Sequence, residues 1–311
     1  MSNYEVSVVA IAHNQEAFIE RAIKSLITQD FALPYEIIVV NDSSTDNTEN
    51  IIQSLVNKHD NIRLLNVSFK APGLTRIAGL QAATGKYITF LDGDDFYHKS
   101  MIRILYDAMI KNAADLVHCS HFYLRKKHIQ SNKLHRNAVF DKYGALNAYF
   151  QDIYFLSFMS TKMFNAKLLK SIDFHIPRYN VLFEDVVMCF EILAKCEKVV
   201  TIKDNLYYYD KTNVHSATNT AKQRVQGHIN VFALIRHLID LTGDEEILKL
   251  WRKHKIRRKL SLLADALLDK KHPKKAAESK SFRQQMRLIN DKKVLKIEDQ
   301  PYSKFIKDSL S

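Results

Sequence analysis

The sequence predicts an α/β protein in which a mostly parallel sheet is flanked by helices and followed by a helical C-terminal region. Short apolar runs of strand length recur through the first third of the chain, and segments with helical periodicity lie between them. Strands that alternate with helices in this way form a parallel sheet covered on both faces. After about residue 221 the pattern is wholly helical, which predicts a separate region there.

The expected strands are short and almost entirely apolar. They occupy residues 6–11, 35–40, 62–67, 87–91 and 115–120. Between the first two, residues 17–27 are expected to form a helix because apolar side chains recur every three or four positions. Residues 183–196 are expected to form a later helix for the same reason, and residues 198–210 a strand at a sheet edge.

The positive charge lies almost entirely after the predicted boundary at residue 221. The net charge is +12, and residues 222–311 contain 22 Lys and Arg against 11 Asp and Glu. Residues 1–221 are close to neutral, with 24 basic and 23 acidic residues. A chain of 311 residues, 46% of them hydrophobic, is long enough for one large domain with an appended basic helical region.

The cysteines and the apolar runs predict a cytoplasmic protein. Cys119, Cys189 and Cys196 have no spacing typical of metal ligands, so we expect buried, reduced thiols. The N-terminus has no basic segment before an apolar block, and no later run approaches the ~18 apolar residues of a spanning helix. We therefore expect neither an export segment nor a membrane span.

Polar clusters follow three of the expected strands. These clusters are IAHNQE at 11–16, NDSSTDNT at 41–48 and LDGDD at 91–95. Ligands of open α/β sheets bind beyond the carboxyl ends of the strands. The three clusters are therefore expected to line one cleft.

The cluster after the strand at 87–91 has the composition of a metal site. Asp92, Asp94 and Asp95 supply carboxylate oxygens, which Mg²⁺ and Mn²⁺ prefer, and Gly93 allows a close turn. The structural alternative is a solvated turn in which an aspartate caps a helix. Taken alone, the motif fits this alternative better.

Four motifs in consistent order resemble the inverting glycosyltransferase family 2, which has the GT-A fold. They are SVVAIAHNQEAFIERAIKSLITQ, YEIIVVNDSSTDNT, GLTRIAGLQAATGKYITFLDGDD and, about ninety residues later, FED. The resemblance covers roughly residues 5–216. It implies that residues 1–221 are a GT-A catalytic domain, with nucleotide-sugar binding in about 1–120 and the acceptor side in about 121–221.

The resemblance also implies the nucleotide-sugar site. Its residues would be Ile11, Ala12, His13, Asp42, Arg76, Asp92 and Gly93. The residues at 11–13 would contact the base, and Asp42 the uracil or ribose. Arg76 would offset the charge of the diphosphate, as a cation near phosphate does.

The same resemblance implies a metal site and a catalytic base. Asp94, Asp92 and His215 would bind Mn²⁺ or Mg²⁺, with Asp95 as a cap or supporting partner. Asp185, with Glu184 beside it, would take the proton of the acceptor hydroxyl during inverting transfer. The structural alternatives are a surface histidine and simple compensation of a helix dipole by two acids.

The predicted function is inverting transfer of a hexose or N-acetylhexosamine from a UDP-sugar to a carbohydrate or lipid-linked glycan acceptor. The family implies capsule or lipopolysaccharide synthesis as the setting. The alternatives are a catalytically decayed nucleotide-sugar-binding protein, suggested by Asn41 and Ile77 at motif positions, and a sugar nucleotidyltransferase. Nucleic acid is not an expected partner, because the basic residues lie in a helical tail without a reading motif.

The basic C-terminal segment allows three interpretations. Around Trp251, apolar and basic residues alternate with helical spacing. Such a helix can lie on an anionic membrane, here the inner face of the plasma membrane. It can instead pack its apolar side on the catalytic domain or form oligomer contacts.

Overall fold

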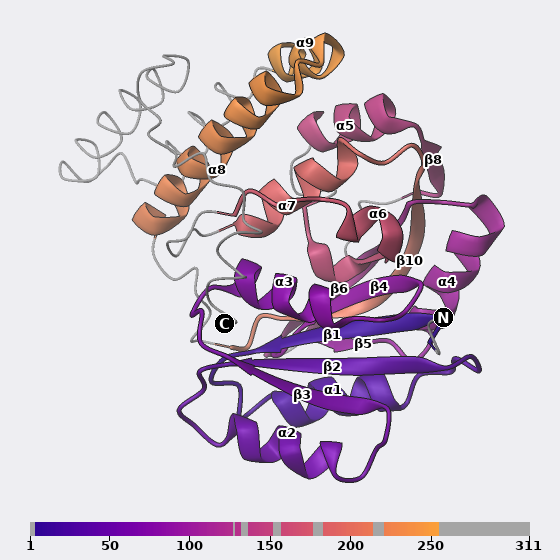
Figure 1. Ribbon diagram of the computed structural model, residues 1–311, viewed down its shortest axis with the longest axis vertical. Coiled ribbons are helices and arrows are strands. Elements are labelled where there is room, and N and C mark those ends of the chain that lie inside the picture. Colours follow the sequence, from indigo (N-terminus) through magenta and orange to yellow (C-terminus); the bar gives the residue numbers. More distant parts are fainter. Residues whose placement is uncertain are drawn as a thin grey trace.

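The computed structural model describes residues 4–126, 128–131, 136–151, 157–176, 183–213 and 221–254. Figure 1 shows a central sheet with helices on both sides and, beyond it, a layer of helices from the second half of the chain. The fold is a mostly parallel α/β sheet flanked by helices, so the predicted fold class is confirmed.

The sheet contains the four expected parallel strands of the first half side by side. Along the sheet the order is β3-β2-β1-β4-β9-β6-β10-β5, with β7 paired to β6 and β8 to β10. The first four strands by number are β1 (Val6–Ala12), β2 (Tyr35–Asp42), β3 (Ile62–Val67) and β4 (Tyr87–Asp92). The others are β5 (Phe96–Tyr97), β6 (Leu116–Arg125), β7 (His128–Ser131), β8 (Ala138–Phe140), β9 (Lys162–Asn165) and β10 (Val199–Asp210).

One antiparallel strand, β9, lies between β4 and β6. Met163 of β9 pairs with Thr89 of β4 on one side and with Val117 of β6 on the other. Because β9 is short and its apolar run continues directly into a helix, the sequence pattern did not predict it. It matters for the site because it fills the sheet beside the strand that ends at Asp92.

The helices divide between the two faces of the sheet according to their buried side chains. One face is covered by α1 (Ile19–Ile27), α2 (Thr48–Val56) and α4 (Met101–Asn112). The other face is covered by α3 (Pro72–Ala82), α5 (Lys142–Gln151), α6 (Ala166–Lys170), α7 (Glu184–Leu193) and α8 (Ala221–Thr242). A short 3₁₀ turn, η1 (Met159–Thr161), precedes β9.

The predicted apolar face of the first helix is confirmed. Ile19, Ala22, Ile23 and Leu26 of α1 are fully buried, and Ile27 packs against the same core. Their recurrence at three and four positions places them on one side of the helix. The sequence therefore determined both the helix and the side that it turns to the sheet.

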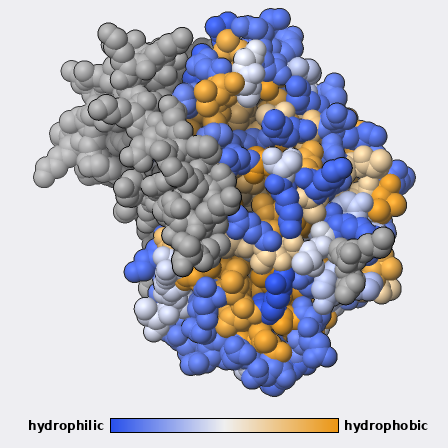
Figure 2. Space-filling view, in the orientation of Figure 1, coloured by the Kyte–Doolittle hydropathy of each residue, from blue (hydrophilic) through white to orange (hydrophobic). Residues whose placement is uncertain are grey.

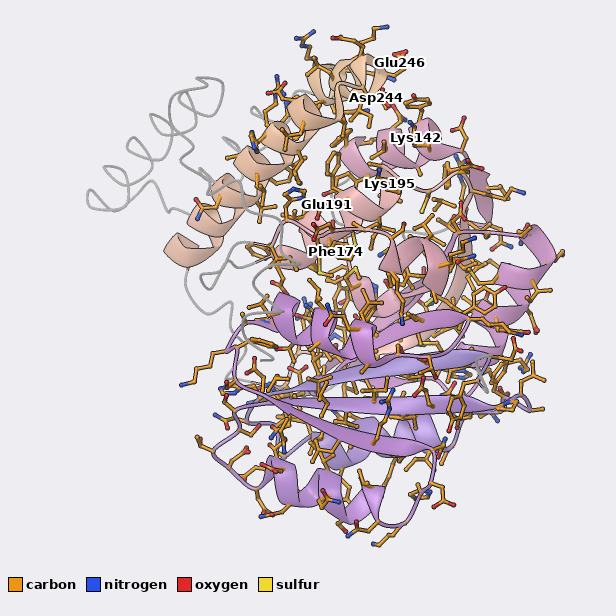
Figure 3. All side chains as sticks on the ribbon, in the orientation of Figure 1. Lys142, Phe174, Glu191, Lys195, Asp244 and Glu246 are labelled. Atoms are coloured by element: carbon orange, nitrogen blue, oxygen red, sulfur yellow. The ribbon has the colours of Figure 1, made fainter. Side chains whose placement is uncertain are left out.

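The last described helices share the core of the sheet domain. Phe232, Ile235 and Ile239 of α8 are buried in the same cluster as the side chains of α7. Lys142 of α5 donates to Asp244, which caps α9 (Glu245–Lys253), at 3.0 Å (Figure 3). The division at residue 221 into two domains stays a prediction.

Trp251 packs between α5 and α8. Its ring lies 5.7 Å from that of Phe150 and 6.1 Å from that of Phe232. For α9, this contact favours packing on the domain over insertion into a membrane. Residues 255–311, which hold most of the basic segment, lie outside the described residues.

The described helices were compared with the length and apolar character that a membrane span requires. In the part of the chain that the structure describes, no helix is both long and apolar enough to cross a bilayer. Figure 2 shows apolar side chains interleaved with hydrophilic ones on the visible face.

Candidate active site

The carboxyl ends of β1, β2 and β4 bring the three predicted polar clusters together. In the sheet register Ile11 pairs with Asp92, and Ala12 pairs with Asn41. His13, which is exposed just beyond β1, contacts the carbonyl oxygen of Asp42 through Nδ1 at 2.6 Å. The expected common edge is therefore present, although Ile11 and Ala12 are themselves buried.

Gly93 lies where no side chain fits. A Cβ atom at this position would be 2.7 Å from the carbonyl oxygen of Ile11. The close approach of two backbones requires glycine, because a real Cβ is essentially never that near. Gly93 thus holds the turn after β4 tightly against the end of β1.

Asp42 has a structural role in positioning α3. Its carboxylate accepts from the backbone nitrogens of Lys70 and Ala71, at 2.9 and 3.1 Å, and from the Thr75 hydroxyl at 2.7 Å. Lys70 and Ala71 directly precede α3, and Thr75 lies in its first turn. Asp42 is 3% exposed and ties the segment before α3 to the helix, and its contact with a nucleotide stays a prediction.

Arg76 joins the acidic turn after β4 to the first turn of α7. Its guanidinium lies 2.6 Å from Asp92 and 2.5 Å from Glu184, and the arginine is 7% exposed. Gly73 on the same helix permits this approach, since a Cβ there would be 3.0 Å from the Glu184 side chain. Three predicted site residues therefore meet in one buried ion-pair network.

Asp185 combines partial exposure with a raised pKa. Burial, with the charges of Glu184 and Asp92, raises the pKa of Asp185 to about 7, while Arg76 and Lys162 oppose this shift. One carboxylate oxygen accepts from the nitrogen of Val186 at 2.9 Å. A carboxylate with a pKa near 7 can take up a proton from a hydroxyl far more readily than an ordinary aspartate.

Asp94 and Asp95 lie on the same turn but in different environments. Asp94 accepts from the side-chain amide of Asn213 at 2.9 Å. Burial and the charge of Asp92 raise the pKa of Asp94. Asp95 is 1% exposed and accepts from the Tyr207 hydroxyl and the Asp210 nitrogen, at 2.5 and 2.7 Å. It therefore supports the turn, as expected for a partner that does not itself face the ligand.

The donor chemistry of the turn fits a divalent cation. Asp92 and Asp94 present hard carboxylate oxygens, and the charge of Asp92 adds to burial in raising the pKa of Asp94, so a cation between them would offset this repulsion. Within the described ranges, no group of three His, Cys, Asp or Glu side chains is arranged to hold a metal ion. The third predicted ligand, His215, lies outside these ranges.

Two site residues were not predicted from the sequence. Arg21 of α1 donates to the carbonyl of Asp94 and to the carboxylate of Asp210, both at 2.7 Å. Lys162, at the start of β9, is completely buried near Asp185. A lysine directly before the apolar residues Met163 and Phe164 was the only local signal for the second, and nothing in the sequence signalled the first.

Comparison with known proteins identifies the family. A model of the family described as glycosyl transferase family 2 matches residues 7–188, which is more than half of the chain. The chain belongs to glycosyl transferase family 2. The match includes most of β1, the strands β2 to β9, the acidic turn and the Glu184–Asp185 pair described above.

Two of the relatives in the family are bacterial. The cholesterol galactosyltransferase of Borreliella burgdorferi is 26% identical over 66% of this chain and 59% of its own length. The poly(ribitol-phosphate) beta-N-acetylglucosaminyltransferase TarS of Staphylococcus aureus is 26% identical over 65% of this chain and 35% of its own length. The matched region thus spans less than two thirds of these relatives.

Two solved structures share the fold over most of the chain. The crystal structure of S. aureus TarS 1-349 in complex with UDP-GlcNAc has a TM-score of 0.62 and 20% identity, covering 92% of this chain and 90% of that one. The mannosyltransferase PcManGT from Pyrobaculum calidifontis, in complex with GDP-Man and Mn²⁺, has a TM-score of 0.57 and 15% identity. It covers 92% of this chain and 85% of that one.

Proposed function

We propose that the protein is an inverting glycosyltransferase that moves a hexose or N-acetylhexosamine from a UDP-sugar to a carbohydrate or lipid-linked glycan acceptor. The observation that carries this proposal is the environment of Asp185. It has a pKa of about 7 and lies beside the Arg76–Glu184–Asp92 network, at the edge of the sheet where α/β proteins bind ligands. A poised base next to a buried cation suits direct displacement at a sugar carbon.

In the proposed reaction, Asp185 takes the proton of the acceptor hydroxyl. The hydroxyl oxygen forms a bond to the anomeric carbon while the bond from that carbon to the diphosphate breaks, and UDP leaves with the bonding electrons. The attack comes from the side opposite the leaving group, so the configuration inverts. No covalent enzyme intermediate is needed, and a single base suffices.

Arg76 is proposed to act on the donor side of this reaction. It is held between two carboxylates, so its charge is fixed in place before the donor binds. Mn²⁺ or Mg²⁺ held by Asp94 and Asp92, with His215 as a further ligand, would neutralise charge on the diphosphate. In the proposed donor complex, His13 and Asp42 lie nearest the base and ribose.

UDP is the proposed nucleotide because a protein of similar fold is described with a UDP-sugar. TarS, the structure with the highest TM-score among those given above, is described in complex with UDP-GlcNAc. Two observations support the proposed metal. Asp92 and Asp94 offer carboxylate ligands, and PcManGT is described with Mn²⁺. The relatives are named for cholesterol and poly(ribitol-phosphate) acceptors, so the acceptor here is proposed only as a glycan or lipid-linked glycan.

The proposed setting is bacterial surface polysaccharide synthesis at the cytoplasmic side of the membrane. Peripheral contact with the membrane would involve residues beyond α9, because the Trp251 ring already packs against Phe150 and Phe232. The test is flotation of the full chain with anionic vesicles of phosphatidylglycerol at low salt, against neutral vesicles. Absence of binding to both would refute membrane association without affecting the transferase proposal.

The test of the function begins with ligand binding. Thermal unfolding is measured with UDP, GDP, CMP and NAD⁺, each with and without Mn²⁺, because a ligand of the native state raises its stability. Stabilisation by UDP that requires Mn²⁺ is expected. UDP-sugars are then tested one by one for UDP release, and NMR of the product sugar reports whether its anomeric configuration is inverted.

The same experiment separates the alternatives. A decayed nucleotide-sugar-binding protein would be stabilised by UDP but release none from any UDP-sugar. A sugar nucleotidyltransferase would release pyrophosphate from UTP and a sugar phosphate instead. Asn41 is the substitution that suggests decay. Its side-chain amide donates to Asn66 at 3.0 Å and the residue is 2% exposed, so we propose no catalytic role for it.

A further inference from the structure

Lys162 is a charged residue in an apolar interior. It is 0% exposed and among the largest fully buried side chains of the described residues. Lysine is almost never completely buried without a partner, because removal of an ammonium group from water costs several kcal/mol or more. The position of this charge therefore requires an explanation from its surroundings.

The strand alternation directs Lys162 toward α7. Successive side chains of a strand point to opposite faces of the sheet. Met163 packs in the cluster beneath α1 and α4, whereas Phe164 packs in the cluster that contains the side chains of α7. Lys162 has the same parity as Phe164, so it projects to the face covered by α7.

Two hydrogen bonds place the ammonium group beneath the first turns of that helix. Nζ of Lys162 donates to the carbonyl of Phe158. The neighbouring carbonyl, of Ser157, accepts from the Cys189 thiol at 3.0 Å. Cys189 follows Asp185 by four positions and so lies on the same side of α7. The side of the helix that bears Asp185 thus lies over the segment that holds the lysine.

Two cations, Arg76 and Lys162, act on Asp185, and Arg76 acts more strongly. The titratable groups that interact with Asp185 across these elements are Arg76, Asp92, Tyr149, Lys162, Glu184, Cys189 and Tyr209. Of the two cations, Arg76 forms its ion pairs with Asp92 and Glu184. Among the described residues, no carboxylate lies within salt-bridge distance of Lys162, and its ammonium group donates to a neutral carbonyl, so its charge acts on Asp185 through space.

We propose that Lys162 is a positioning residue that acts as the buried counter-ion of Asp185, keeping its carboxylate ionised and thereby setting the lower pH limit of sugar transfer. The pair gains from a low dielectric, where opposite charges attract more strongly than in water. Consistently, burial lowers the pKa of Lys162, and Cys189 and Asp185 raise it. The proposal rests on the proposed function only in assigning the pH limit to transfer.

The first experiment compares pH profiles of Lys162→Met and the wild type. The substrate is the UDP-sugar from which the wild type releases UDP. The rate of UDP release is measured between pH 5 and 9 at one fixed Mn²⁺ concentration. The acid limb is the pH range in which the rate falls as the pH is lowered. For Lys162→Met it is expected about one pH unit or more higher, because the lost cation stabilised the Asp185 carboxylate. Lys167→Met, at an exposed lysine of α6, is the matched control and should leave the limb unchanged. An unshifted limb in a folded Lys162→Met variant that still binds UDP would overturn the proposal.

The second experiment needs no enzymatic activity. Thermal midpoints at pH 8 are compared for the wild type, Lys162→Met, Asp185→Asn and the double variant. Loss of Lys162 should lower the midpoint less in the Asp185→Asn background, by about 2 °C or more, because no carboxylate is then left unpaired. Equal losses in both backgrounds contradict the pairing.

The two experiments also separate their possible failures. If no UDP-sugar yields UDP with the wild type, the proposed function fails. The thermal comparison still tests whether Lys162 stabilises the Asp185 carboxylate. If Lys162→Met does not fold, the double variant should regain folding, since both buried charges are removed. A double variant that stays unfolded would count against the proposal.

Discussion

The guanidinium of Arg76 and the carboxylate of Glu184 lie 2.5 Å apart, although 108 positions separate them in the sequence. The same guanidinium contacts Asp92 at 2.6 Å. This contact joins the helix after the third strand, the turn after the fourth strand and the first turn of α7. The position of Asp185, which follows Glu184, therefore depends on an arginine in a distant motif.

Arg76→Met should strongly destabilise the fold. It would leave Asp92 and Glu184 as neighbouring carboxylates without their cation, and breaking a buried ion pair typically costs about 3–5 kcal/mol. Urea unfolding without ligands measures the loss. Arg103→Met is the control, since Arg103 pairs with Asp30 at 3.2 Å on the surface and should contribute at most about 1 kcal/mol. Equal losses in the two variants would refute the importance of the network.

Asp185→Asn should abolish sugar transfer and leave UDP binding nearly unchanged. The asparagine keeps the shape of the side chain but cannot accept the proton, a change that costs about 10²- to 10⁴-fold in rate. UDP release measures the rate, and calorimetric titration with UDP and Mn²⁺ measures binding. Asp204→Asn, at an exposed position of β10, should retain full activity. Near-normal turnover by Asp185→Asn would exclude Asp185 as the base.

The pH dependence of rate and stability should be opposite near neutrality. Because the pKa of Asp185 is about 7 in the folded protein, the rate should rise as the pH increases through 7. Between the usual aspartate pKa and 7, only the folded state keeps this proton, so its contribution to stability falls as the pH rises. Asp185→Asn should consequently be more stable than the wild type at pH 8, by on the order of 1–3 kcal/mol. A variant that is less stable at pH 8 would contradict the buried, raised pKa.

Asp42→Ala should destabilise the protein even without nucleotide. The change removes the acceptor of two backbone nitrogens and the Thr75 hydroxyl at the start of α3, which predicts a loss of about 2–3 kcal/mol. Urea unfolding of the ligand-free protein measures it. Asp60→Ala, at an exposed position, is the control. Unchanged stability together with weaker UDP binding would mean that Asp42 acts only as a ligand contact.

Asp94→Asn should weaken UDP binding in the presence of Mn²⁺ by about tenfold or more, because a neutral amide is a poorer ligand for a hard cation. Binding without metal should change little. Calorimetry with and without EDTA measures both, and Asp107→Asn on the exposed side of α4 is the control. Equal affinity of Asp94→Asn and the wild type in Mn²⁺ would exclude Asp94 as a metal ligand.

Local patterns were sufficient for much of the fold. The strands at 6–11, 35–40, 62–67 and 87–91 correspond to β1, β2, β3 and β4 because each is rich in apolar side chains over the length of a strand. The strand at 115–120 was too short, since β6 continues to Arg125 through a polar and basic stretch. That stretch is paired on both sides by β7 and β10, which are contacts that no local pattern contains.

The short strands were missed for the same reason. Strands β5, β8 and β9 have two to four residues each and exist because neighbouring strands supply their hydrogen bonds. A strand of that length has no periodicity of its own. Their pairing partners, not their sequences, decide their conformation.

The sequence by itself determined the fold class, the parallel strands β1 to β4, the family, and the residues that gather at one edge, because these depend on apolar periodicity and on motifs of contiguous residues. The tertiary structure alone decided how those residues are used. It directed the Asp42 carboxylate to the start of α3, placed Arg76 between two acids, and buried Lys162 near Asp185. Ion pairs and burial arise between segments far apart in the chain, and the charge state of a carboxylate is set by these neighbours rather than by its own position in the sequence.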